Sequence, residues 1–473
     1  MRFDGFIGET YQARSANANA ERCVNLFPEI TGGSGKSKIH YLHTPGLTEL
    51  ATLSDGPVRC LWAGDDKLYA VAGGTYGQIL LGGLTFVPIG SVANDGKKAY
   101  IYSSATETGV GGHLIIVSGG RLYCDTGAGF TDQIASASGT YLDGYFISLT
   151  PNSNEVRISG LLNGTSWEVL DSQARLSSAD RLVAIASDKK LLWLFGKRNI
   201  DIWYNSGNAD FPFEPVQGAS IRSGTVHPHT IEELDNSFFF VMEDERGGAS
   251  VVRTEGYSLR RVSTHAIEKR ISNVMLDLFV SWAYEEEGHK FYVLSDLVGW
   301  ETFVYDAATN MWHERAYWSG AAWAAVLGRC HAYTTPGYYT TGGSHFVGSR
   351  LNGKVYRQSM DFYTDAGGAI RRYRQAPHLS DGQAWSFYHE LELDMSIAGQ
   401  PDIKLKWSDD DGATWSAEKD FAIVPGMSDA KKRIIWRRLG RSRDRIFAVT
   451  LHGINAPVSI NDAFLELTKG TGA

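Results

Sequence analysis

The sequence has few cysteines, and none of the four lies close to another. Among its 473 residues the thiols are Cys23, Cys60, Cys124 and Cys330. Without a C-x-x-C pair, neither a zinc ribbon nor a dithiol redox motif can form. Four cysteines in a chain of this length also argue against a disulfide framework. The sequence therefore predicts reduced and mostly buried thiols, as in proteins made in a cytosol.

Long hydrophobic runs are missing as well. A membrane-spanning helix needs about 18 or more consecutive apolar residues, whereas the longest runs, at residues 238–242 and 321–327, have the length of a β-strand. The first residues do not combine a basic region with an apolar stretch, so no signal peptide is expected. Both absences predict a soluble protein.

The chain has no excess of positive charge. It carries 45 Lys and Arg against 53 Asp and Glu, for a formal net charge of −8. This balance argues against a protein that coats nucleic acid over its whole surface, although a local basic patch is compatible with it. Proline is also scarce, at 13 residues against 52 glycines. That ratio indicates many tight turns without a collagen-like repeat or a disordered linker.

Aromatic residues, in contrast, are abundant: 13 Trp, 22 Tyr and 21 Phe. They lie with β-branched residues in short runs that are broken by Gly, Asn and Asp, which is the pattern of strands and turns. Helical spacing is found at residues 263–280, where four apolar residues recur at intervals of three or four. The sequence thus predicts an all-β chain with one helix.

A strand-rich unit recurs along the chain. Its starts lie roughly 40 to 50 residues apart, a period typical of β-propeller blades, near Val58, Ala99, Gly139, Arg181, Val226, Val280 and Ala321. We therefore expect a propeller of six or seven blades within residues 58–370. The N-terminal segment, residues 1–57, is a candidate for the strand that closes the circle. Several separate sandwiches would need linkers, and no Pro/Ser-rich linker lies between residues 58 and 360.

Beyond the propeller the composition changes. Residues 371–377 are polar, basic and contain a proline, and we interpret them as a connection. Further strands are expected at residues 387–397, 403–407, 434–439, 446–451 and 464–467. Five short alternating strands suit a small β-sandwich-like domain over residues 371–473.

Residues 408–415 match the Asp-box pattern Ser-x-Asp-x-Gly-x-x-Trp. Asp410 is expected to bond the N–H groups of a turn, Gly412 to take the positive φ, and Trp415 to pack beneath the turn. A structural hairpin is the favoured interpretation. Three adjacent acids could alternatively hold Ca²⁺, but no ligand set with the spacing of a calcium loop follows.

Other candidate motifs are weak. Residues 33–37 look like the end of a phosphate-binding loop, but Ile30 stands where that motif needs Gly. His227 and His229 have a metal-compatible spacing, yet we expect solvated or turn histidines. Residues 285–287, three consecutive glutamates, are expected in a solvated turn. Without a nucleophile, metal or phosphate motif, we predict no catalytic residue, no cofactor and no metal, hence no enzyme.

Residues 431–445 are the most charged segment. They form two predicted strands around residues 440–443, with arginines on one strand face and the turn that need acidic or phosphate partners. Those partners could be acids of the same chain or a neighbouring chain, or nucleic acid. The basic residues are Lys431, Lys432, Arg433, Arg437, Arg438, Arg441, Arg443 and Arg445, against Asp444 alone.

An ordered set of motifs resembles the tail-accessory proteins of short-tailed bacteriophages, often called packaged DNA stabilisation proteins. No single motif is decisive; their order along nearly the whole chain carries the resemblance. The motifs are Arg-Cys-Val-Asn-Leu-Phe-Pro-Glu at 22–29, Tyr-Leu-His-Thr-Pro-Gly-Leu at 41–47, Leu-Asp-Asn-Ser-Phe-Phe-Phe-Val at 234–241, Val-Tyr-Asp-Ala-Ala-Thr-Asn-Met-Trp at 304–312 and Trp-Arg-Arg-Leu-Gly-Arg at 436–441.

This resemblance implies a tail hub or nozzle protein of the virion, synthesised in the host cytoplasm. Six copies would form a ring below the portal and adaptor rings, with the genome passing through the channel. The outside would help to seat tailspikes or fibres, and a plug or needle protein would close the far end. The family has no catalytic residues to transfer. A different class of function is a carbohydrate-binding or glycoside-active propeller, which exposed Trp residues beside two carboxylates in the central depression would favour.

The two uses of the basic segment can be weighed against the net charge. A channel that conducts DNA benefits from a surface that does not bind phosphates tightly. The chain outside residues 431–445 has a negative net charge. We therefore expect Arg437, Arg438, Arg441 and Arg443 to lie nearer to protein partners than to the channel axis, where arginine–carboxylate contacts would fix orientation.

Overall fold

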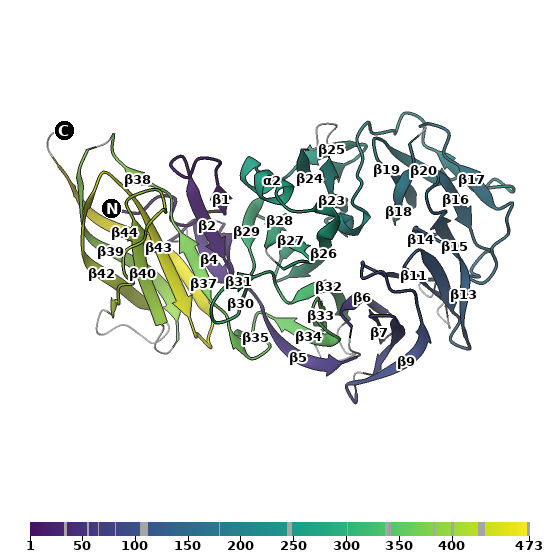
Figure 1. Cartoon of the computed structure of the whole chain (residues 1–473), viewed down its shortest axis with the longest axis horizontal. Helices are drawn as coiled ribbons and strands as arrows, with labels where there is room; N and C mark the ends of the chain where they lie inside the picture. Colours follow the sequence, from purple (N-terminus) through teal and green to yellow (C-terminus); the bar gives the residue numbers. More distant parts are fainter. Residues whose placement is uncertain are drawn as a thin grey trace.

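A computed structural model describes residues 1–470, apart from 33–35, 54–55, 65, 81, 105–111, 179, 244–247, 300, 336–339, 341, 383, 399–401 and 424–430. The first three residues of the phosphate-loop-like segment 33–37 therefore lie outside the described residues. The molecule is elongated, with a circle of blades at one end and a sandwich of sheets at the other (Figure 1). Among the described residues, no helix has the length and apolar character needed to cross a membrane.

Six consecutive four-stranded antiparallel units follow one another around an axis. Each unit uses four strands in chain order, which is the connectivity expected for propeller blades. Their strands are β6–β9 (Val58–Gly64, Lys67–Ala72, Thr75–Leu80, Thr85–Ser91), β10–β13 (Tyr100–Ser103, Leu114–Ser118, Arg121–Asp125, Phe130–Ala135), β14–β17 (Ser138–Leu142, Tyr145–Leu149, Glu155–Ile158, Ser172–Ala174), β18–β21 (Leu182–Asp188, Leu191–Gly196, Ile200–Asn205, Phe213–Pro215), β22–β25 (Glu232–Leu234, Ser237–Glu243, Ala249–Glu255, Ser258–Arg261) and β26–β29 (Phe279–Glu286, His289–Asp296, Thr302–Asp306, Met311–Glu314).

The seventh blade is built from both ends of the propeller sequence. Its first three strands are β32 (Gly328–Thr334), β33 (Ser344–Ser349) and β34 (Lys354–Ser359), and its fourth is β5 (Gly46–Thr52) from the N-terminal segment. β5 runs antiparallel to β34, with Leu47 opposite Gln358. The described residues thus form seven blades, within the predicted six or seven. Short pairs surround the last blade: β30 (Tyr317–Trp318) with β31 (Trp323–Ala324), and β35 (Thr364–Asp365) with β36 (Gly368–Ala369).

Neighbouring blades cover one another's faces. Cys60, Tyr69 and Tyr76 of the first blade pack in one buried cluster with Ile101 and Ile116 of the second. A four-stranded sheet has two faces to bury, and radial stacking covers both while leaving only short edges. The short aromatic and β-branched runs of the sequence therefore supply the side chains that are buried between neighbouring blades.

The single α-helix of the described residues is shorter than the 263–280 predicted. α2 spans His265–Ser272, between the N-cap Thr264 and the C-cap Asn273. The apolar spacing continues past Asn273 in the sequence, but that stretch forms an extended segment and the 3₁₀ helix η2 (Leu276–Leu278). The prediction was wrong in length because the inner strand of the sixth blade follows at once and requires an extended chain.

The C-terminal strands form a sandwich of two sheets. One sheet has the order β3-β4-β44-β39-β42-β41, and the other contains β2, β37 and β43, with β38 and β40 paired to β43. Leu391, Leu393, Trp436, Phe447 and Val449 are buried between the sheets. The bounds are β1 (Tyr11–Gln12), β2 (Ala20–Val24), β3 (Leu26–Ile30), β4 (Ile39–His43), β37 (Arg372–Gln375), β38 (Leu379–Ser380), β39 (Ser386–Ile397), β40 (Asp402–Ser408), β41 (Ala422–Ile423), β42 (Lys432–Ser442), β43 (Asp444–His452) and β44 (Val458–Lys469).

Residues 371–377, predicted as a connection, instead contain the strand β37. Arg374 is fully buried there, and its guanidinium donates to the carbonyl of Phe6 at 2.7 Å and to the carboxylate of Glu21. The partners that make a charged strand tolerable come from the N-terminal segment, about 350 residues away along the chain. The composition of residues 371–377 alone could not identify these distant partners.

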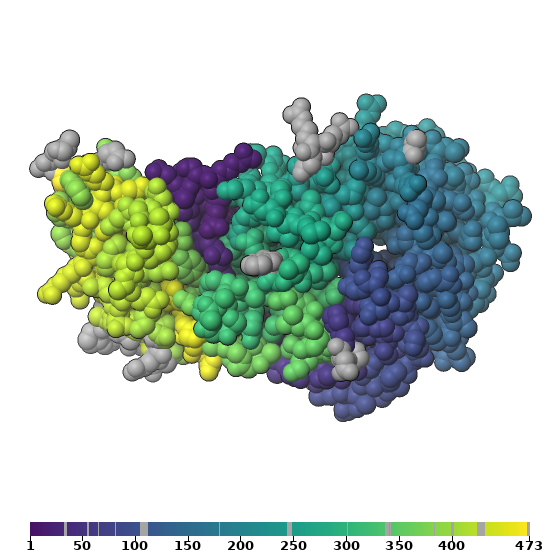
Figure 2. Space-filling model, in the orientation of Figure 1, coloured from purple at the N-terminus to yellow at the C-terminus, as the bar shows by residue number. Residues whose placement is uncertain are grey.

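The N-terminal segment joins the two parts of the molecule. β2 lies beside β37 of the sandwich and also meets β29 of the sixth blade, with Val24 opposite Glu314. A single sheet therefore continues from the sixth blade into the sandwich. Figure 2 shows N-terminal residues, in purple, filling the seam between the yellow-green sandwich and the teal blade.

A buried carboxylate holds this seam. Glu314 accepts hydrogen bonds from Arg22 of β2 at 2.6 Å, from Arg270 of α2 at 2.9 Å and from the Thr10 hydroxyl at 2.6 Å. Its side chain is only 5% exposed. Burial by itself raises the pKa of a carboxyl group, but the two guanidinium charges together outweigh it and hold the pKa of Glu314 well below its usual value.

We expect Glu314→Gln to lower the free energy of unfolding at pH 7 by about 3–5 kcal/mol, because it leaves two half-buried arginines at the seam without their shared, buried anion. The wild-type carboxylate stays ionised in the folded state below the pH at which it protonates in the unfolded chain. Its stabilisation is therefore complete above the unfolded pKa and falls as the pH drops towards the folded pKa. Urea unfolding at pH 7 and pH 4 should show a smaller difference between the two proteins at pH 4.

The matched control is Glu466→Gln, which removes an exposed carboxylate from the sandwich. Its stability should stay within about 0.5 kcal/mol of wild type at both pH values. An equal loss in both variants would show that Glu314 has no special role at the seam.

Candidate functional site

The basic segment, residues 431–445, spans both sheets of the sandwich. β42 belongs to one sheet and β43 to the other, with Arg443 between them. Arg438 adopts φ of +58°, and the register of β42 against β39 shifts beside it, between the positions of Tyr388 and Glu390. This bulge interrupts the alternation of side chains. The expectation that the arginines share one strand face and turn is wrong for Arg445, which is buried at 2% exposure.

Three of the arginines are paired within the chain. Arg433 bonds Glu392, Arg437 donates to Glu390 at 2.8 Å, and Arg445 donates to both carboxylate oxygens of Asp409 at 2.6 and 2.7 Å. Arg433 and Arg437 lie at the surface, where such pairs contribute little to stability.

Arg445 differs from the other arginines because its side chain is only 2% exposed. Its guanidinium also bonds the carbonyl of Leu439 and stacks on the rings of Tyr388 and Trp407, at 4.7 and 5.2 Å from their centres. This residue is built into the sandwich core. Lys432, at 7% exposure, is likewise buried.

The remaining basic residues, Lys431, Arg438, Arg441 and Arg443, are exposed, and none has a carboxylate partner among the residues that the structure describes. The guanidinium of Arg441 lies 4.6 Å from the ring centre of Trp385 and 5.9 Å from that of Phe387, and that of Arg443 lies 5.1 Å from Trp385.

We call Trp385, Phe387, Arg441 and Arg443 the Trp385 patch. Stacking on the rings orients the two guanidinium groups and leaves their N–H groups available for a partner. The sequence indicates the arginines of this patch, but it gives no sign that Trp385 gathers them.

Residues 408–415, the Asp-box segment, form a turn that we call the acidic turn. Hydrogen bonds from its own side chains hold it in place. Asp410 accepts a hydrogen bond from the Thr414 backbone N–H at 2.8 Å and from its hydroxyl at 2.6 Å. The Ser408 hydroxyl donates to Asp410 at 2.7 Å and accepts from the Gly412 N–H at 2.8 Å. Gly412 has φ of +89°, which glycine adopts without strain.

Trp415 lies against the sandwich rather than fully inside it. Its ring is half-buried and packs against Val24, Tyr373 and Ala448, with the Lys406 ammonium 4.5 Å from the ring centre. The indole therefore covers the sheet that contains β43. Its loss should cost less than the loss of a fully buried tryptophan.

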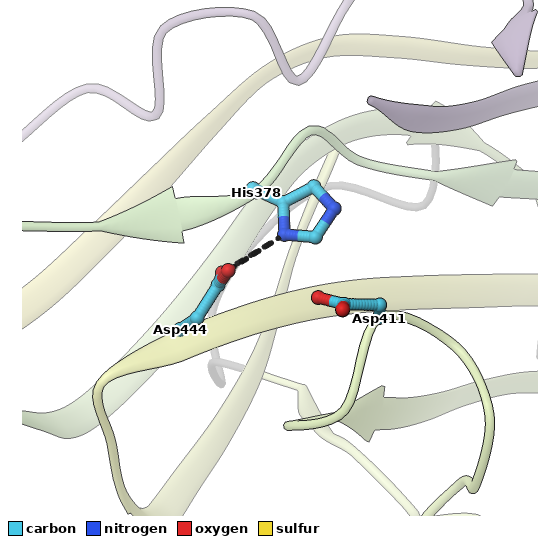
Figure 3. Close-up of side chains that lie close together, drawn as sticks. All are labelled: His378, Asp411 and Asp444. Carbon is cyan, nitrogen blue, oxygen red and sulfur yellow. Dashed lines mark hydrogen bonds and ion pairs between the residues drawn. The ribbon is translucent and has the colours of Figure 1, made fainter. Parts of the chain in front are cut away.

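The three adjacent acids of the turn point to different partners. Asp409 pairs with Arg445, Asp410 closes the turn, and Asp411 lies beside His378 and Asp444 (Figure 3). They do not converge on one point, so the geometry does not favour the calcium alternative. Ligand atoms of His378, Asp411 and Asp444 instead lie within 4.8 Å of one another. The sequence analysis missed this group because its members are far apart in the chain.

The two spaced histidines do not form a shared site. Nδ1 of His229 is hydrogen-bonded to the Tyr100 hydroxyl at 3.1 Å. Nδ1 of His227 lies 3.3 Å from Oδ1 of Asp277. Burial, helped by the positive charge of Lys98, lowers the pKa of His229 to about 4. Both belong to a turn around η1 (Pro228–Thr230), as expected, but His227 is buried rather than solvated.

The run of glutamates at 285–287 is not uniformly solvated. Glu286 is half-buried and accepts hydrogen bonds from the Met360 N–H at 3.0 Å and the Gln358 amide at 3.3 Å. Burial raises its pKa. Glu286 therefore connects the sixth and seventh blades, whereas its two neighbours are exposed.

A cavity of about 380 Å³ lies on the propeller axis, lined mainly by the first strands of the blades. It contains the feature that would favour a carbohydrate site, two tryptophans beside two glutamates: Trp62, Trp282, Glu232 and Glu233. Trp282, however, is only 3% exposed, and Glu232 is bonded by Lys98 and by the Ser281 hydroxyl. This arrangement neutralises one carboxylate and hides one ring from a ligand.

Comparison with protein families gives two matches that together cover most of the chain. Residues 7–363 match the family described as bacteriophage P22 Gp10, beta-propeller, and residues 371–467 match the one described as bacteriophage P22 Gp10, beta-sandwich. None of the curated proteins matches the chain.

Solved structures give only distant likenesses. The N-terminal domain of Nup159 is 11% identical with a TM-score of 0.39, and covers 70% of this chain and 98% of its own. The WD40 propeller of Doa1 is 13% identical at 0.38, covering 66% and 97%. The extracellular domain of BT4673 from B. thetaiotaomicron is 8% identical at 0.42, covering 83% and 48%. Such scores add nothing to the assignment.

The burial of Arg445 and the exposure of its neighbours make a direct test possible. We expect Arg445→Ala to lower the free energy of unfolding by about 2–4 kcal/mol, because it removes a buried charge and leaves the bonded carbonyl unsatisfied. Arg441→Ala and Arg443→Ala should each stay within about 0.5 kcal/mol of wild type. Urea unfolding followed by tryptophan fluorescence measures the stability of all three variants. Equal losses of stability would contradict the conclusion that Arg445 belongs to the core and the other two arginines to the surface.

Proposed function

Because the chain belongs to the bacteriophage P22 Gp10 family and is a structural protein of a phage tail, we propose that six copies form a hub or nozzle ring. The ring lies below the portal and adaptor rings, retains the packaged DNA and forms the channel for its ejection. Its outside helps to seat tailspikes or fibres, and a plug or needle protein closes the far end. The protein is synthesised in the host cytoplasm and then joins the virion.

The observation that carries the assembly proposal is the Trp385 patch. Two guanidinium groups of the sandwich are held over one indole, with no acidic partner among the described residues. Tryptophan and arginine are the residue types that contribute most at the centres of protein interfaces. Arg441 and Arg443 are therefore suited to carboxylates of a neighbouring subunit or adaptor.

The surroundings of the patch favour a protein partner over DNA. Arg437 is already paired with Glu390, and Lys469 with Asp381 at 2.8 Å, so acidic groups are interspersed with the basic ones. A backbone-tracking DNA surface needs a continuous run of unpaired basic side chains. Together with the net charge of −8, this supports a channel along which DNA slides and an interface that the arginines orient.

The same family and the side chains that line the axial cavity support a non-enzymatic role. Glu232, one of the two glutamates that line the cavity, forms an ion pair with Lys98 that neutralises its charge. Burial raises its pKa and the lysine charge opposes that effect. A glycosidase needs two available carboxylates on either side of a sugar, and of the two glutamates that line this cavity Glu232 is held by Lys98.

The proposed copy number has a direct measurement. Light scattering of the purified chain with an isolated portal–adaptor ring should show the mass of the ring plus six chains. A different whole number at saturation would refute the hexamer, and no complex at any ratio would refute the position below the adaptor.

The double variant Arg441→Glu with Arg443→Glu should block incorporation into particles while the free chain stays folded. The reversal replaces two hydrogen-bond donors by acceptors and brings like charges together at the interface. The amount of this chain in purified particles measures incorporation, and urea unfolding checks the fold.

The matched control is Lys197→Glu with Arg198→Glu, which makes the same charge change on exposed residues of the fourth blade. It should be incorporated normally. If the Arg441/Arg443 variant is incorporated normally but its particles leak or fail to eject DNA, the patch belongs to the channel instead.

A further inference from the structure

We propose that His378, Asp411 and Asp444 bind a divalent transition-metal ion such as Zn²⁺. The three residues come from the segment after β37, from the acidic turn and from the first position of β43 (Figure 3). Their ligand atoms, one imidazole nitrogen and two carboxylate oxygens, lie within 4.8 Å of one another. This site is independent of the proposed role in the tail.

The hydrogen bond on the far side of the imidazole fixes which nitrogen can bind a metal. Nε2 of His378 lies 2.7 Å from the carbonyl oxygen of Ala16. A carbonyl oxygen only accepts, so Nε2 carries the hydrogen. In the neutral ring the lone pair is then on Nδ1. Metal-binding histidines are typically held in this way, by a backbone carbonyl bonded to the other ring nitrogen.

The lone pair of Nδ1 faces two more acceptors. The two carboxylate oxygens of Asp444 lie 2.9 and 3.0 Å from Nδ1. A neutral imidazole nitrogen and a carboxylate both carry lone pairs, so this approach is favourable with either a proton on Nδ1 or a metal ion beside the pair. Tetrahedral zinc ligands lie about 3.4 Å apart, given Zn–N and Zn–O distances near 2.1 Å. The spacings of this pair, 2.9 and 3.0 Å, are somewhat shorter than that value.

The third ligand is positioned from outside the group. The Asn17 amide donates to Oδ2 of Asp411 at 3.1 Å, which holds the carboxylate towards His378 and leaves Oδ1 available. His378 is 11% exposed and Asp444 25%, so water can complete the coordination from the open side. Three protein ligands with one open position are typical of zinc sites that are not fully closed.

The donor set selects the type of metal. Imidazole nitrogen suits Zn²⁺ and neighbouring transition metals, whereas Ca²⁺ takes six to eight oxygen ligands and Mg²⁺ keeps most of its waters. A single histidine with two carboxylates therefore favours Zn²⁺, with Mn²⁺ as the alternative of the same chemistry. A bound ion would connect the 16–17 loop, the acidic turn and β43, which are far apart in the sequence.

Isothermal titration of ZnCl₂ into the chelator-treated full chain tests the site, with thermal unfolding as a second readout. We expect saturable binding of one ion through this group and a rise in Tm that depends on the zinc concentration. Asp411→Asn and His378→Gln should each weaken that binding at least about tenfold and remove the rise in Tm. Mn²⁺, followed by electron paramagnetic resonance, should bind to the same site and compete with Zn²⁺.

Asp420→Asn is the matched control, because this carboxylate is 83% exposed and lies outside the group. It should bind zinc as wild type does. If wild type takes up no zinc, or if Asp411→Asn binds it unchanged, the proposal is overturned and the group is a protonated histidine paired with Asp444. Asp411→Asn decides the matter should His378→Gln fail to fold.

Discussion

The bond network around Glu314 is the constraint on which the arrangement of the two parts depends. One buried carboxylate takes donors from the N-terminal strand β2 and from the helix α2, while its own backbone ends the sixth blade. The sheet of that blade continues through β2 into the sandwich. Because a buried anion with two arginines tolerates few other geometries, the sandwich is fixed to the propeller as a continuation of its sheet rather than as a domain on a linker.

Arginine has two distinct roles in this molecule. Arg374 and Arg445 are buried and satisfied by carboxylates and carbonyl oxygens, and they define the internal packing of the sandwich. Arg441 and Arg443 have the same group at the surface, where aromatic rings are the contacts found among the described residues. The interior use explains why a basic segment need not bind nucleic acid. The surface use supplies the oriented donors that a structural protein of a phage tail needs for assembly.

Periodicity was enough to predict the fold class, and the propeller with a C-terminal sandwich is confirmed. The five strands predicted for the sandwich are also present, as β39, β40, β42, β43 and β44, although β43 is buried on both faces. What the sequence could not show were partners distant along the chain: Glu21 for Arg374, Asp409 for Arg445, and Trp385 for the two exposed arginines. The domain boundaries at residues 57 and 370 stay predictions, as do the roles of the exposed arginines.

The closure of the seventh blade has a consequence for how the chain reaches its native state. The strand β5 leaves the ribosome about 300 residues before its partner β34. Until then the circle cannot close, and the early strand keeps an unpaired edge that other chains could pair with. Such a long-range pairing makes folding slow. Once formed, however, the β5–β34 pairing connects the last blade to the start of the first. The blades therefore cannot unfold one after another from a free end of the circle.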